Sequence, residues 1–546
     1  DSASQGQARR EMMARIEKEC ATASGNRCDV VTLYSGGRYD LYRYRKYTDV
    51  RLVFAPEESI AAFGGDPDNF TYPRYCFDLS FFRAYENGKP VASKHFLPWS
   101  KTGVKDKELI FVPGNPGTTG RLLTMAQLEY SRDISYPVLY RRLEAMIRAL
   151  MKFSENDAES KRVAGDSILS AQNSYKAYTG FLKGLRDASL MGRKRDEEQT
   201  LRASVAADSE RTRKYGKVWD EVAAAYKQAT EYSKAYNLST PSYSDLFDIA
   251  RNVLRLPEEK AKPSGKRLRE YRDSNLASLE QSIYSPAPIS DALQIAVLAE
   301  NFRFMRDELG ADDKVVVAVL DGKTPEQAAE TYVTTSKLKD VAERKRLAAS
   351  VEAVSDSKDG MIRLARILDS RNRTLRKRYE DTVEAVLATS AASIAQAKFA
   401  AQGASTYPDA TFTFRVAFGT VKGYTLDGKP VPYATQTAGL YKRASGVDPF
   451  KLPPSWLKAK PALKLTTPFN FVSTADIHGG NSGSPTVNTK GEVVGIVFDG
   501  NLESLPNRFV FTDATARAVH VAGQGIVEGL RGVYKAQALL KELGMK

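Results

Sequence analysis

The pattern of hydrophobic and polar residues changes twice along the chain, which predicts three parts. Residues 30–120 contain short β-forming runs such as "DVRLVFAP" and "KELIFVPG", separated by turn sequences such as "ENGKP". From about residue 123 to 402, Ala, Lys, Arg, Glu and Leu dominate and Gly and Pro thin out, which indicates helices. Alternating strand patterns return in "ATFTFRVAFGTVKGY". We therefore expect strand-rich segments at 1–122 and 403–546 around an inserted helical domain at 123–402.

Two stretches of the helical part carry signals for where a helix begins and ends. In "SDALQIAVLAENFRFMRDELG", Ser290 is expected to cap the N-terminus and Gly310 to end the helix. In "TPEQAAETYV", Thr324 is the expected cap, Pro325 lies in the first turn and Gln327 completes a capping box. The first stretch repeats apolar residues along one face, which indicates core packing rather than a cofactor site: Ile295, Leu298, Phe302 and Met305.

The charge balance makes nucleic-acid binding a weak hypothesis. The chain has 80 basic and 66 acidic residues, a net charge of +14, but both signs alternate in stretches such as "RKRDEEQTLR". Such mixing is typical of solvated helix faces rather than of a phosphate-binding patch. No apolar run approaches the roughly 18–20 residues that span a bilayer. We expect neither nucleic acid nor a membrane as a partner, and no metal or cofactor.

Two of the three cysteines are spaced so that they could pair. Cys20 and Cys28 flank a Ser-Gly-Asn turn in "ECATASGNRC". This spacing fits a small disulfide loop formed in an oxidising compartment, and it equally fits two separate thiols. Cys76, in "RYCFD", is the third, and nothing in the sequence gives it the histidine partner that a cysteine protease needs.

The stretch "HGGNSGSP", residues 478–485, is typical of a loop that presents a nucleophilic serine. Its glycines allow a tight turn around Ser482, so that the amides of Gly480 and Ser482 can face one oxyanion. Pro485 then leads into a predicted hairpin, "SPTVNTKGEVVGIVFDG", with its turn at 488–491. A Gly- and Ser-rich turn alone would be weak evidence, and a structural turn is the alternative. The hairpin that follows it favours the nucleophile.

A general base for Ser482 is missing from the expected place. The chain has three histidines: His95, His478 and His520. Two-barrel serine proteases place His, then Asp, then Ser along the chain, and the first 94 residues contain no histidine. We expect His520 to be a strand residue, His478 to have a turn-capping or cleft role, and His95 to be structural.

Longer motifs resemble one family of bacterial enzymes from about residue 10 to the end of the chain. These motifs are "YTDVRLVFAPEESIAAFGGDPDNFTYPRYCFDLSFFRAY", "YPDATFTFRVAFGTVKGY" and "GGNSGSPTVNTKGEVVGIVFDGN". They resemble the dipeptidyl-peptidases 7 and 11, serine exopeptidases that remove dipeptides from peptide N-termini. The resemblance implies an α+β fold: a chymotrypsin-like double β-barrel with a large inserted α-helical lid domain. It also implies peptide substrates with a free N-terminus, a homodimer, and a periplasmic or secreted location.

The resemblance assigns roles to individual residues. Asp78 matches the catalytic acid, which would orient the imidazole and stabilise its charged form. Asn69, Phe70 and Asp499 match the clamp for the substrate's terminal amine, and a carboxylate and an amide oxygen suit an ammonium group. Phe70 stands where the family has Trp, so the indole N–H is lost. Asn173, in "QNSYKAY", resembles a further clamp residue from the lid.

One further position separates branches of the family, and one segment of the family pattern is missing from this chain. The acidic-selective branch places Arg after the clamp Asp, whereas this chain has Gly500, so we expect a hydrophobic second residue in the substrate. The family's base lies in an "NHHCG"-like segment upstream of the residue that matches Asp1. We expect the first barrel to be incomplete here, the chain to be a processed or excised form of a longer protein, and its activity alone to be impaired.

Two other functions remain open from the sequence. A relative that keeps the amine clamp but lacks the base would bind peptides without cleaving them. A basic helical protein that binds nucleic acid is the third hypothesis, and strong salt-dependent retention on DNA would favour it.

Overall fold

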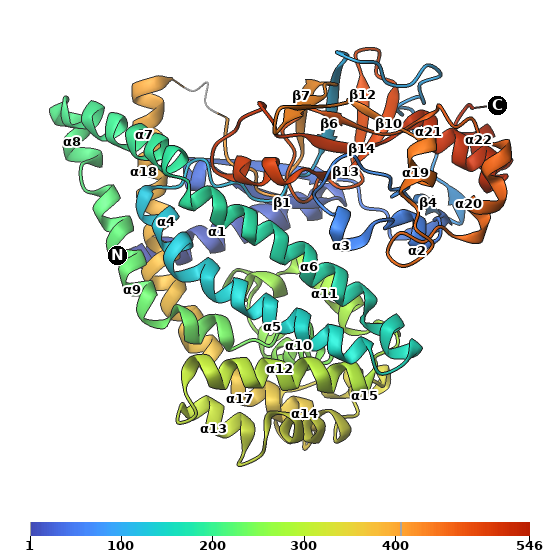
Figure 1. Cartoon of the computed structure of the whole chain (residues 1–546). Helices are drawn as coiled ribbons and strands as arrows, with labels where there is room; N and C mark the ends of the chain where they lie inside the picture. Colours follow the sequence, from blue (N-terminus) through green and yellow to red (C-terminus); the bar gives the residue numbers. More distant parts are fainter. Residues whose placement is uncertain (1, 404–406, 546) are drawn as a thin grey trace. The chain divides into compact units, whose positions relative to one another are not determined.

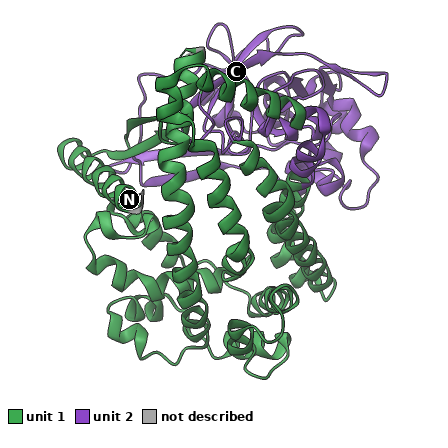
Figure 2. Cartoon of the chain, turned by 90° about the vertical axis from the view of Figure 1, so that its left-hand side faces the viewer, with its two compact units in different colours: residues 1–45, 124–178, 191–407 green, residues 46–123, 179–190, 408–546 purple. Residues whose placement is uncertain are grey.

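A computed structural model describes residues 2–403 and 407–545 (Figure 1). The chain forms two compact units (Figure 2). One, called here the helical unit, contains residues 1–45, 124–178 and 191–407, and the other, the strand-rich unit, contains residues 46–123, 179–190 and 408–546. The units differ from the three expected segments because the first 45 residues group with the helices. Residues 179–190, around the junction of two helices, belong to the strand-rich unit.

The helical unit opens with a helix that the sequence patterns did not indicate. This helix, α1 (Ser2–Ser24), is followed by an antiparallel hairpin of β1 (Arg27–Leu33) and β2 (Arg38–Tyr44). The chain crosses between the units within α6 and α7. The other helices of the unit are α4 (Met125–Tyr130), α5 (Tyr136–Ser154), α6 (Ala158–Arg186), α7 (Ala188–Ala206), α8 (Ser209–Tyr215), α9 (Val218–Leu238), α10 (Asp245–Ala261), α11 (Asp273–Ile283), α12 (Asp291–Leu309), α13 (Lys314–Leu320), α14 (Pro325–Thr334), α15 (Val341–Leu347), α16 (Val351–Ser355), α17 (Gly360–Tyr379) and α18 (Ala385–Gln402).

The two expected helix starts are confirmed. The Ser290 hydroxyl accepts a hydrogen bond from the Leu293 amide at the start of α12, and Gly310 ends that helix with φ 94°. At the start of α14, the Thr324 hydroxyl accepts from the Gln327 amide while the Gln327 side chain accepts from the Thr324 amide, which is the capping box. Local hydrogen bonds of this kind satisfy amides that have no partner inside the helix.

The Cys20 and Cys28 side chains form a disulfide that joins α1 to β1. The sequence had left this pairing open. Cys76 is a free thiol and is fully buried.

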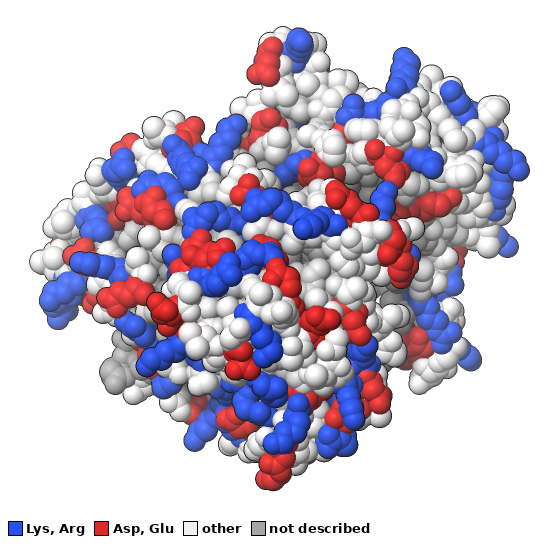
Figure 3. All heavy atoms as spheres, turned by 60° about the horizontal axis from the view of Figure 1, so that its bottom comes forward, with Lys and Arg blue, Asp and Glu red and all other residues white. Residues whose placement is uncertain are grey.

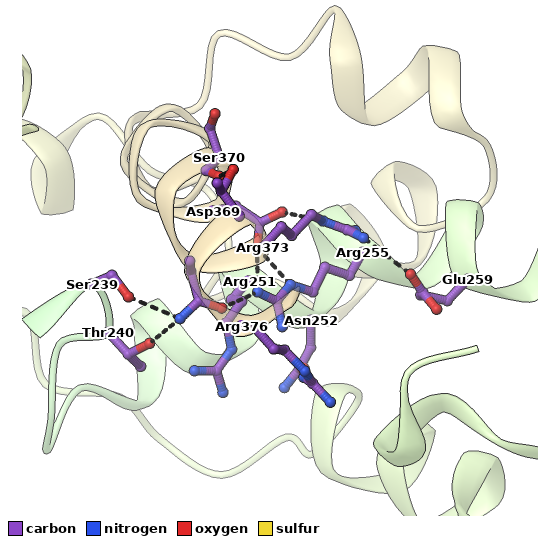
Figure 4. A network of polar contacts seen from close by, with 12 residues as sticks. Ser239, Thr240, Arg251, Asn252, Arg255, Glu259, Asp369, Ser370, Arg373 and Arg376 are labelled. Carbon is purple, nitrogen blue, oxygen red and sulfur yellow. Dashed lines mark hydrogen bonds and ion pairs between the residues drawn. The ribbon is translucent and has the colours of Figure 1, made fainter. Parts of the chain in front are cut away.

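Charged residues in the core of the helical unit neutralise one another. Asp369 on α17 accepts hydrogen bonds from Arg255 (2.6 Å) and from Arg373 (2.7 Å), and Arg373 also reaches Glu259 on α10 (3.1 Å; Figure 4). Arg255 and Glu259 are buried. Because each buried charge has an opposite partner, this network fastens α10 to α17 and leaves no unpaired charge for a ligand among these residues.

The strand-rich unit contains the predicted strands of both outer segments. In its largest sheet, the described strands run in the order β10-β11-β14-β13-β12-β6-β7. The elements of the unit are β3 (Asp49–Phe54), α2 (Glu58–Ala61), α3 (Gly65–Asp68), β4 (Phe81–Glu86), β5 (Lys89–Pro90), β6 (Leu109–Gly114), β7 (Arg415–Thr420), β8 (Tyr424–Leu426), β9 (Lys429–Val431), β10 (Ala434–Gln436), α19 (Thr437–Arg443), α20 (Pro454–Ala459), β11 (Pro468–Ser473), β12 (Pro485–Asn488), β13 (Val493–Gly500), β14 (Ala518–Ala522), α21 (Gly523–Glu528) and α22 (Gln537–Glu542).

The strands on either side of the helical segment are direct neighbours. β6 and β7 pair antiparallel, with Phe111 opposite Phe418, although almost 300 residues separate them in the sequence. Val421, just after β7, bridges Ser473 at the end of β11, so the sheet curls back toward its other side. This curvature encloses an apolar core that includes Ile110, Phe471 and Val497.

A smaller sheet of β3, β4 and β5 has an apolar face that is open to solvent. Leu52 pairs with Phe82 and Val50 with Ala84, so these side chains share one face. Val50 is 54% exposed, and Leu52 and Phe82 are each 61% exposed. The other face contributes Val53, Phe54 and Phe81 to the core around Phe77 and Trp456. An antiparallel sheet that packs one face on the core normally presents polar residues on its solvated face, so this exposed apolar surface is unusual.

The surface carries mixed charge. Figure 3 shows Lys and Arg side chains interspersed with Asp and Glu over the face that it displays, rather than gathered into one basic patch. Among the described residues, no helix combines the length and the apolar content required to cross a bilayer.

Candidate active site

The loop 478–485 is held in one conformation by its own hydrogen bonds. Buried Asn481 accepts a bond from the His478 amide through its side chain (3.0 Å) and donates its own amide to the His478 carbonyl (2.9 Å). Gly480 has φ 106°, and a Cβ atom there would lie 2.5 Å from the Asn115 carbonyl oxygen. Only glycine fits this position, because the backbone conformation and the close approach both exclude a side chain.

Ser482 lies at the exposed tip of this loop, next to β13. Its hydroxyl donates to the Phe498 carbonyl (3.2 Å), and the neighbouring Gly483 amide donates to the Val497 carbonyl (2.8 Å). Among the described residues, the amides of Gly480 and Ser482 donate no hydrogen bond within the chain, and both residues are exposed. The loop therefore presents a hydroxyl and two free donors on an accessible surface.

The hairpin after the loop forms as predicted. β12 pairs antiparallel with β13, and the side chain of Asn488 accepts hydrogen bonds from the amides of Lys490 and Glu492 (3.0 Å each). Gly491 adopts φ 77°, which the tight turn requires. The hairpin carries β13 past Ser482 to the predicted clamp residue Asp499, and the strand ends at Gly500.

Asp499 is buried, and its carboxylate holds the backbone of the Phe70 loop and of its own strand. Its Oδ2 atom accepts from the Phe70 amide (3.1 Å) and from Nη1 of Arg74 (2.8 Å), and its Oδ1 atom accepts from the Gly500 amide (2.8 Å). Burial raises the pKa of Asp499, while Arg74 and the two amides act in the opposite direction. A carboxylate has about four acceptor positions, so one remains for a ligand.

The clamp residues Asn69 and Phe70 follow the short helix α3. Phe70 adopts φ 56°, a left-handed conformation that is rare for a bulky residue, and its amide is the one that Asp499 binds. Asp68, just before them, is buried and forms an ion pair with Arg443. The loop is thus held from both sides, and the Phe70 amide, next to Asn69, is bonded to Asp499.

Asp78 lies in the same neighbourhood. It is exposed between the buried side chains of Phe77 and Leu79, in an extended segment that is not part of a strand. Desolvation raises the pKa of Asp78, the nearby Arg74 lowers it, and Asp499 raises it. Asp78 and Asp499 therefore lie within electrostatic range of the same guanidinium, and the Ser482 hydroxyl is bonded to Phe498 on the strand that carries Asp499.

Gly500 leaves space that a side chain would fill only after a small adjustment. A Cβ atom at this position would lie 2.6 Å from the Ser504 hydroxyl oxygen, which can rotate away, and 3.4 Å from the Arg517 carbonyl oxygen.

Asn173 lies on the exposed surface of α6 in the helical unit. It belongs to a different unit from the other predicted residues, so its contribution stays a prediction.

None of the three histidines is hydrogen-bonded to Ser482 in the described part of the chain. His478 interacts with Asp476 (3.3 Å) and Arg121 (3.0 Å). Burial disfavours the charge on Asp476, but these two partners outweigh it and lower its pKa to about 2. His95 is exposed. His520, a strand residue as predicted, is fully buried in β14.

Arg74 is the residue of this site that the sequence reasoning missed. It stands in the motif "TYPRY" as a single cation among aromatic residues, which is the only signal that the sequence offers. In the structure it is buried and contacts Asp499 directly. Within the described residues, no group of His, Cys, Asp and Glu side chains is arranged to hold a metal ion.

Comparison with known proteins identifies the family. Residues 1–545 match the family described as peptidase S46, and the chain belongs to this family. The chain is 28% identical to an Asp/Glu-specific dipeptidyl-peptidase of Shewanella putrefaciens, over 97% of this chain and 79% of the relative. It is 26% identical to dipeptidyl-peptidase 7 of Porphyromonas endodontalis, over 98% of this chain and 68% of the relative. The resemblance seen in the sequence is therefore confirmed.

Solved structures support the mixed helix and strand fold. The crystal structure of Porphyromonas endodontalis DPP11 in complex with the dipeptide Arg-Glu matches with a TM-score of 0.76 at 21% identity, over 96% of this chain and 79% of that chain. DPP11 without a named ligand matches with a TM-score of 0.72 at 20% identity, over 97% of this chain and 80% of that chain. The Asp/Glu specificity in the first relative's name does not fit the hydrophobic preference expected from Gly500 well.

Proposed function

We propose that this chain carries most of a serine-type dipeptidyl aminopeptidase, which releases dipeptides from the N-termini of peptides. The observation that carries the proposal is the position of Ser482. Its exposed hydroxyl donates to the carbonyl of Phe498 on β13, and the next residue of that strand is Asp499, whose carboxylate is buried. A nucleophile at a fixed distance from a binding site for an amine would cut a peptide a fixed number of residues from its N-terminus.

The proposed roles follow from the chemistry of each group. Ser482 attacks the carbonyl carbon of the second residue, and the amides of Gly480 and Ser482 stabilise the oxyanion. Asp78 orients the histidine base. Asp499 and the side-chain oxygen of Asn69 bind the terminal ammonium in this scheme.

The base itself is proposed to come from polypeptide outside these 546 residues. Both ring nitrogens of His520 are bonded to hydroxyls in the core, and His478 is bonded to Asp476 and Arg121. The exposed apolar face of β3 and β4, with Leu52 and Phe82, is where the rest of an incomplete first β-barrel would pack. The curled sheet that returns from β7 to β11 supports a second barrel of the chymotrypsin type.

The terminal amine decides whether a peptide is a substrate. We expect acetylation of the N-terminus to lower kcat/KM by at least about 100-fold, because a charge-assisted contact with a buried carboxylate is lost. The measurement compares hydrolysis of Val-Leu-Ala-Ala and its acetylated form by the complete gene product. Equal cleavage of both peptides would indicate an endopeptidase and would refute the proposal.

Gly500 is proposed to favour a hydrophobic second residue, as in a branch without a cation at this position. Gly500→Arg is expected to raise the affinity for Val-Glu relative to Val-Leu by about tenfold or more, because it supplies the missing charge partner. Gly500→Ala is the matched control, since it meets the same Ser504 hydroxyl without adding charge. Calorimetry on the chain measures both affinities, and an unchanged ratio in Gly500→Arg would remove Gly500 from the specificity pocket.

A peptide-binding protein without catalysis is the second candidate. It is favoured by one observation, the lack of a hydrogen bond between Ser482 and any histidine in the described residues. A complete gene product that binds Val-Leu-Ala-Ala but does not cleave it would establish this candidate. The disulfide between Cys20 and Cys28 supports a periplasmic or secreted location for either function.

A further inference from the structure

Arg74 is bonded to Asp499 in the candidate clamp for the substrate's terminal amine, which is called here the amine site and comprises Asn69, Phe70 and Asp499. Its Nη1 atom donates to Oδ2 of Asp499 (2.8 Å) and to the Asp68 carbonyl, and its Nε atom donates to Sγ of Cys76 (3.0 Å). The guanidinium carbon lies 5.4 Å from the centre of the Phe498 ring. The Arg74 side chain is 8% exposed and that of Asp499 is 7% exposed, so this ion pair lies in the protein interior.

A buried carboxylate without a cation would be neutral, and a neutral acid attracts an ammonium group only weakly. The groups that face Asp499 are the amides of Phe70 and Gly500, the guanidinium of Arg74, and the negative charge of Asp78. Cys76 adds a thiol whose pKa is raised by burial to about 11, so it is uncharged at neutral pH. Arg74 is the sole cation in this set.

We propose that Arg74 is the positioning residue of the amine site, because its ion pair with Asp499 keeps that carboxylate charged and directed toward the substrate's ammonium group. This inference rests on the proposed function. The ion pair uses one acceptor position of the Asp499 carboxylate, and one position remains for the ligand's ammonium group. The ligand is therefore bound by a carboxylate whose orientation is already fixed. Fixing the acceptor in advance lowers the entropy cost of binding.

The same cation acts electrostatically on the candidate catalytic acid. Arg74 lowers the pKa of Asp78, which desolvation and Asp499 raise. Without Arg74, the buried Asp499 carboxylate and the nearby Asp78 carboxylate would lose the cation that offsets their repulsion, and they would retain a proton at higher pH than either does now. Loss of Arg74 should therefore make amine binding depend on pH, with weak binding at low pH and recovery as the pH rises through the new ionisation.

A purely structural role for Arg74 predicts a different result. Arg74 and Arg443 both hold the loop at Asp68: Arg74 donates to the Asp68 carbonyl, and Arg443 forms an ion pair with its carboxylate. Within the described residues, Arg443 forms no hydrogen bond or ion pair with Asp499. If the loop geometry alone matters, loss of either guanidinium should weaken binding at every pH. If the charge on Asp499 matters, only the Arg74 variant should become pH-dependent.

The test measures binding by calorimetry to the chain itself, which avoids any need for the missing base. The ligands are Val-Leu and N-acetyl-Val-Leu, and the proteins are wild type, Arg74→Met, Arg74→Lys and Arg443→Met, each between pH 5.5 and 8. Wild type and Arg74→Lys are expected to keep a constant preference for the free amine across this range, and Arg443→Met, which loosens the loop at Asp68, is expected to bind more weakly but without a pH-dependent preference. Arg74→Met is expected to lose about tenfold of this preference at pH 6 and to regain part of it at pH 8.

The outcomes separate this inference from the proposed function. If wild type binds both ligands equally, the amine site itself is wrong. If wild type prefers the free amine and Arg74→Met shows the same preference at every pH, or Arg443→Met shows the same pH dependence, the role of Arg74 is overturned. If circular dichroism shows that Arg74→Met is unfolded, the wild-type data provide the test. A preference for Val-Leu over N-acetyl-Val-Leu that stays constant from pH 7.5 to 5.5 supports the inference. A tenfold fall of this preference over the same range overturns it.

Discussion

Replacing Ser482 with alanine is expected to lower kcat/KM for Val-Leu-Ala-Ala by about 10⁴-fold or more, because no other group can form the acyl intermediate. The serine occupies an exposed tip and donates only to a backbone carbonyl in the described structure, so its loss removes little packing. The variant should therefore keep the stability of the wild type and its affinity for Val-Leu. Initial rates on the complete gene product measure the first effect, and calorimetry measures the second.

Ser484→Ala is the matched control for this prediction. Ser484 lies two residues further along the same loop, and its amide donates to the Asn481 carbonyl (2.8 Å), a bond that alanine preserves. Its hydroxyl has no role in the proposed chemistry, so the rate should change less than threefold, roughly 0.6 kcal/mol. Hydrolysis that survives Ser482→Ala, or that disappears in Ser484→Ala as well, would mean that the loop does not carry the nucleophile.

Features that depend on neighbouring residues could be predicted from the sequence. The caps at Ser290 and Thr324 and the turn at Asn488 form because each side chain reaches amides two or three residues away. The serine loop belongs to the same class, since Gly480 must adopt a conformation that other residues avoid. In all these cases the residue type and its spacing contain most of the physical cause.

Features that depend on distant residues could not be predicted in this way. The role of Arg74 is set by Asp499, which lies 425 positions away. Phe70 adopts a left-handed conformation that its residue type disfavours, because the Asp499 carboxylate holds its amide. The pairing of β6 with β7 and the grouping of residues 1–45 with the helices have the same origin. The family resemblance assigned Asp499 and Asn69 to one clamp but could not reveal the cation that pairs with Asp499.

The buried histidine leads to a second large effect, on stability rather than on rate. His520 is fully buried in β14, where its Nε2 atom is 2.8 Å from the Ser473 hydroxyl and its Nδ1 atom is 2.7 Å from the Thr486 hydroxyl. Its ring stacks on Phe471 at 4.5 Å. Burial lowers the pKa of His520 to about 3. The folded protein therefore keeps this imidazole neutral under conditions in which the unfolded chain would protonate it.

The free energy of unfolding is expected to fall as the pH drops below about 6.5, the ordinary pKa of histidine in the unfolded chain. The unfolded state then binds a proton that the folded state excludes until the pH approaches 3, so this single group costs about 3 kcal/mol of stability at pH 4.5. His520→Gln cannot titrate, so its stability should depend less on pH by this amount. Urea unfolding at pH 7.5 and at pH 4.5, followed by tryptophan fluorescence, gives the difference for each protein.

His95→Gln provides the control, because His95 is exposed and its replacement should leave the pH dependence of the wild type unchanged. If His520→Gln loses as much stability as the wild type between pH 7.5 and 4.5, His520 is not the group responsible.

The burial of His520 also bears on catalysis. His520 pairs with Val497 on β13, two residues before Asp499. An imidazole that stays neutral and bonded at both nitrogens in this sheet supports the strand of the amine site, and it cannot take a proton from Ser482.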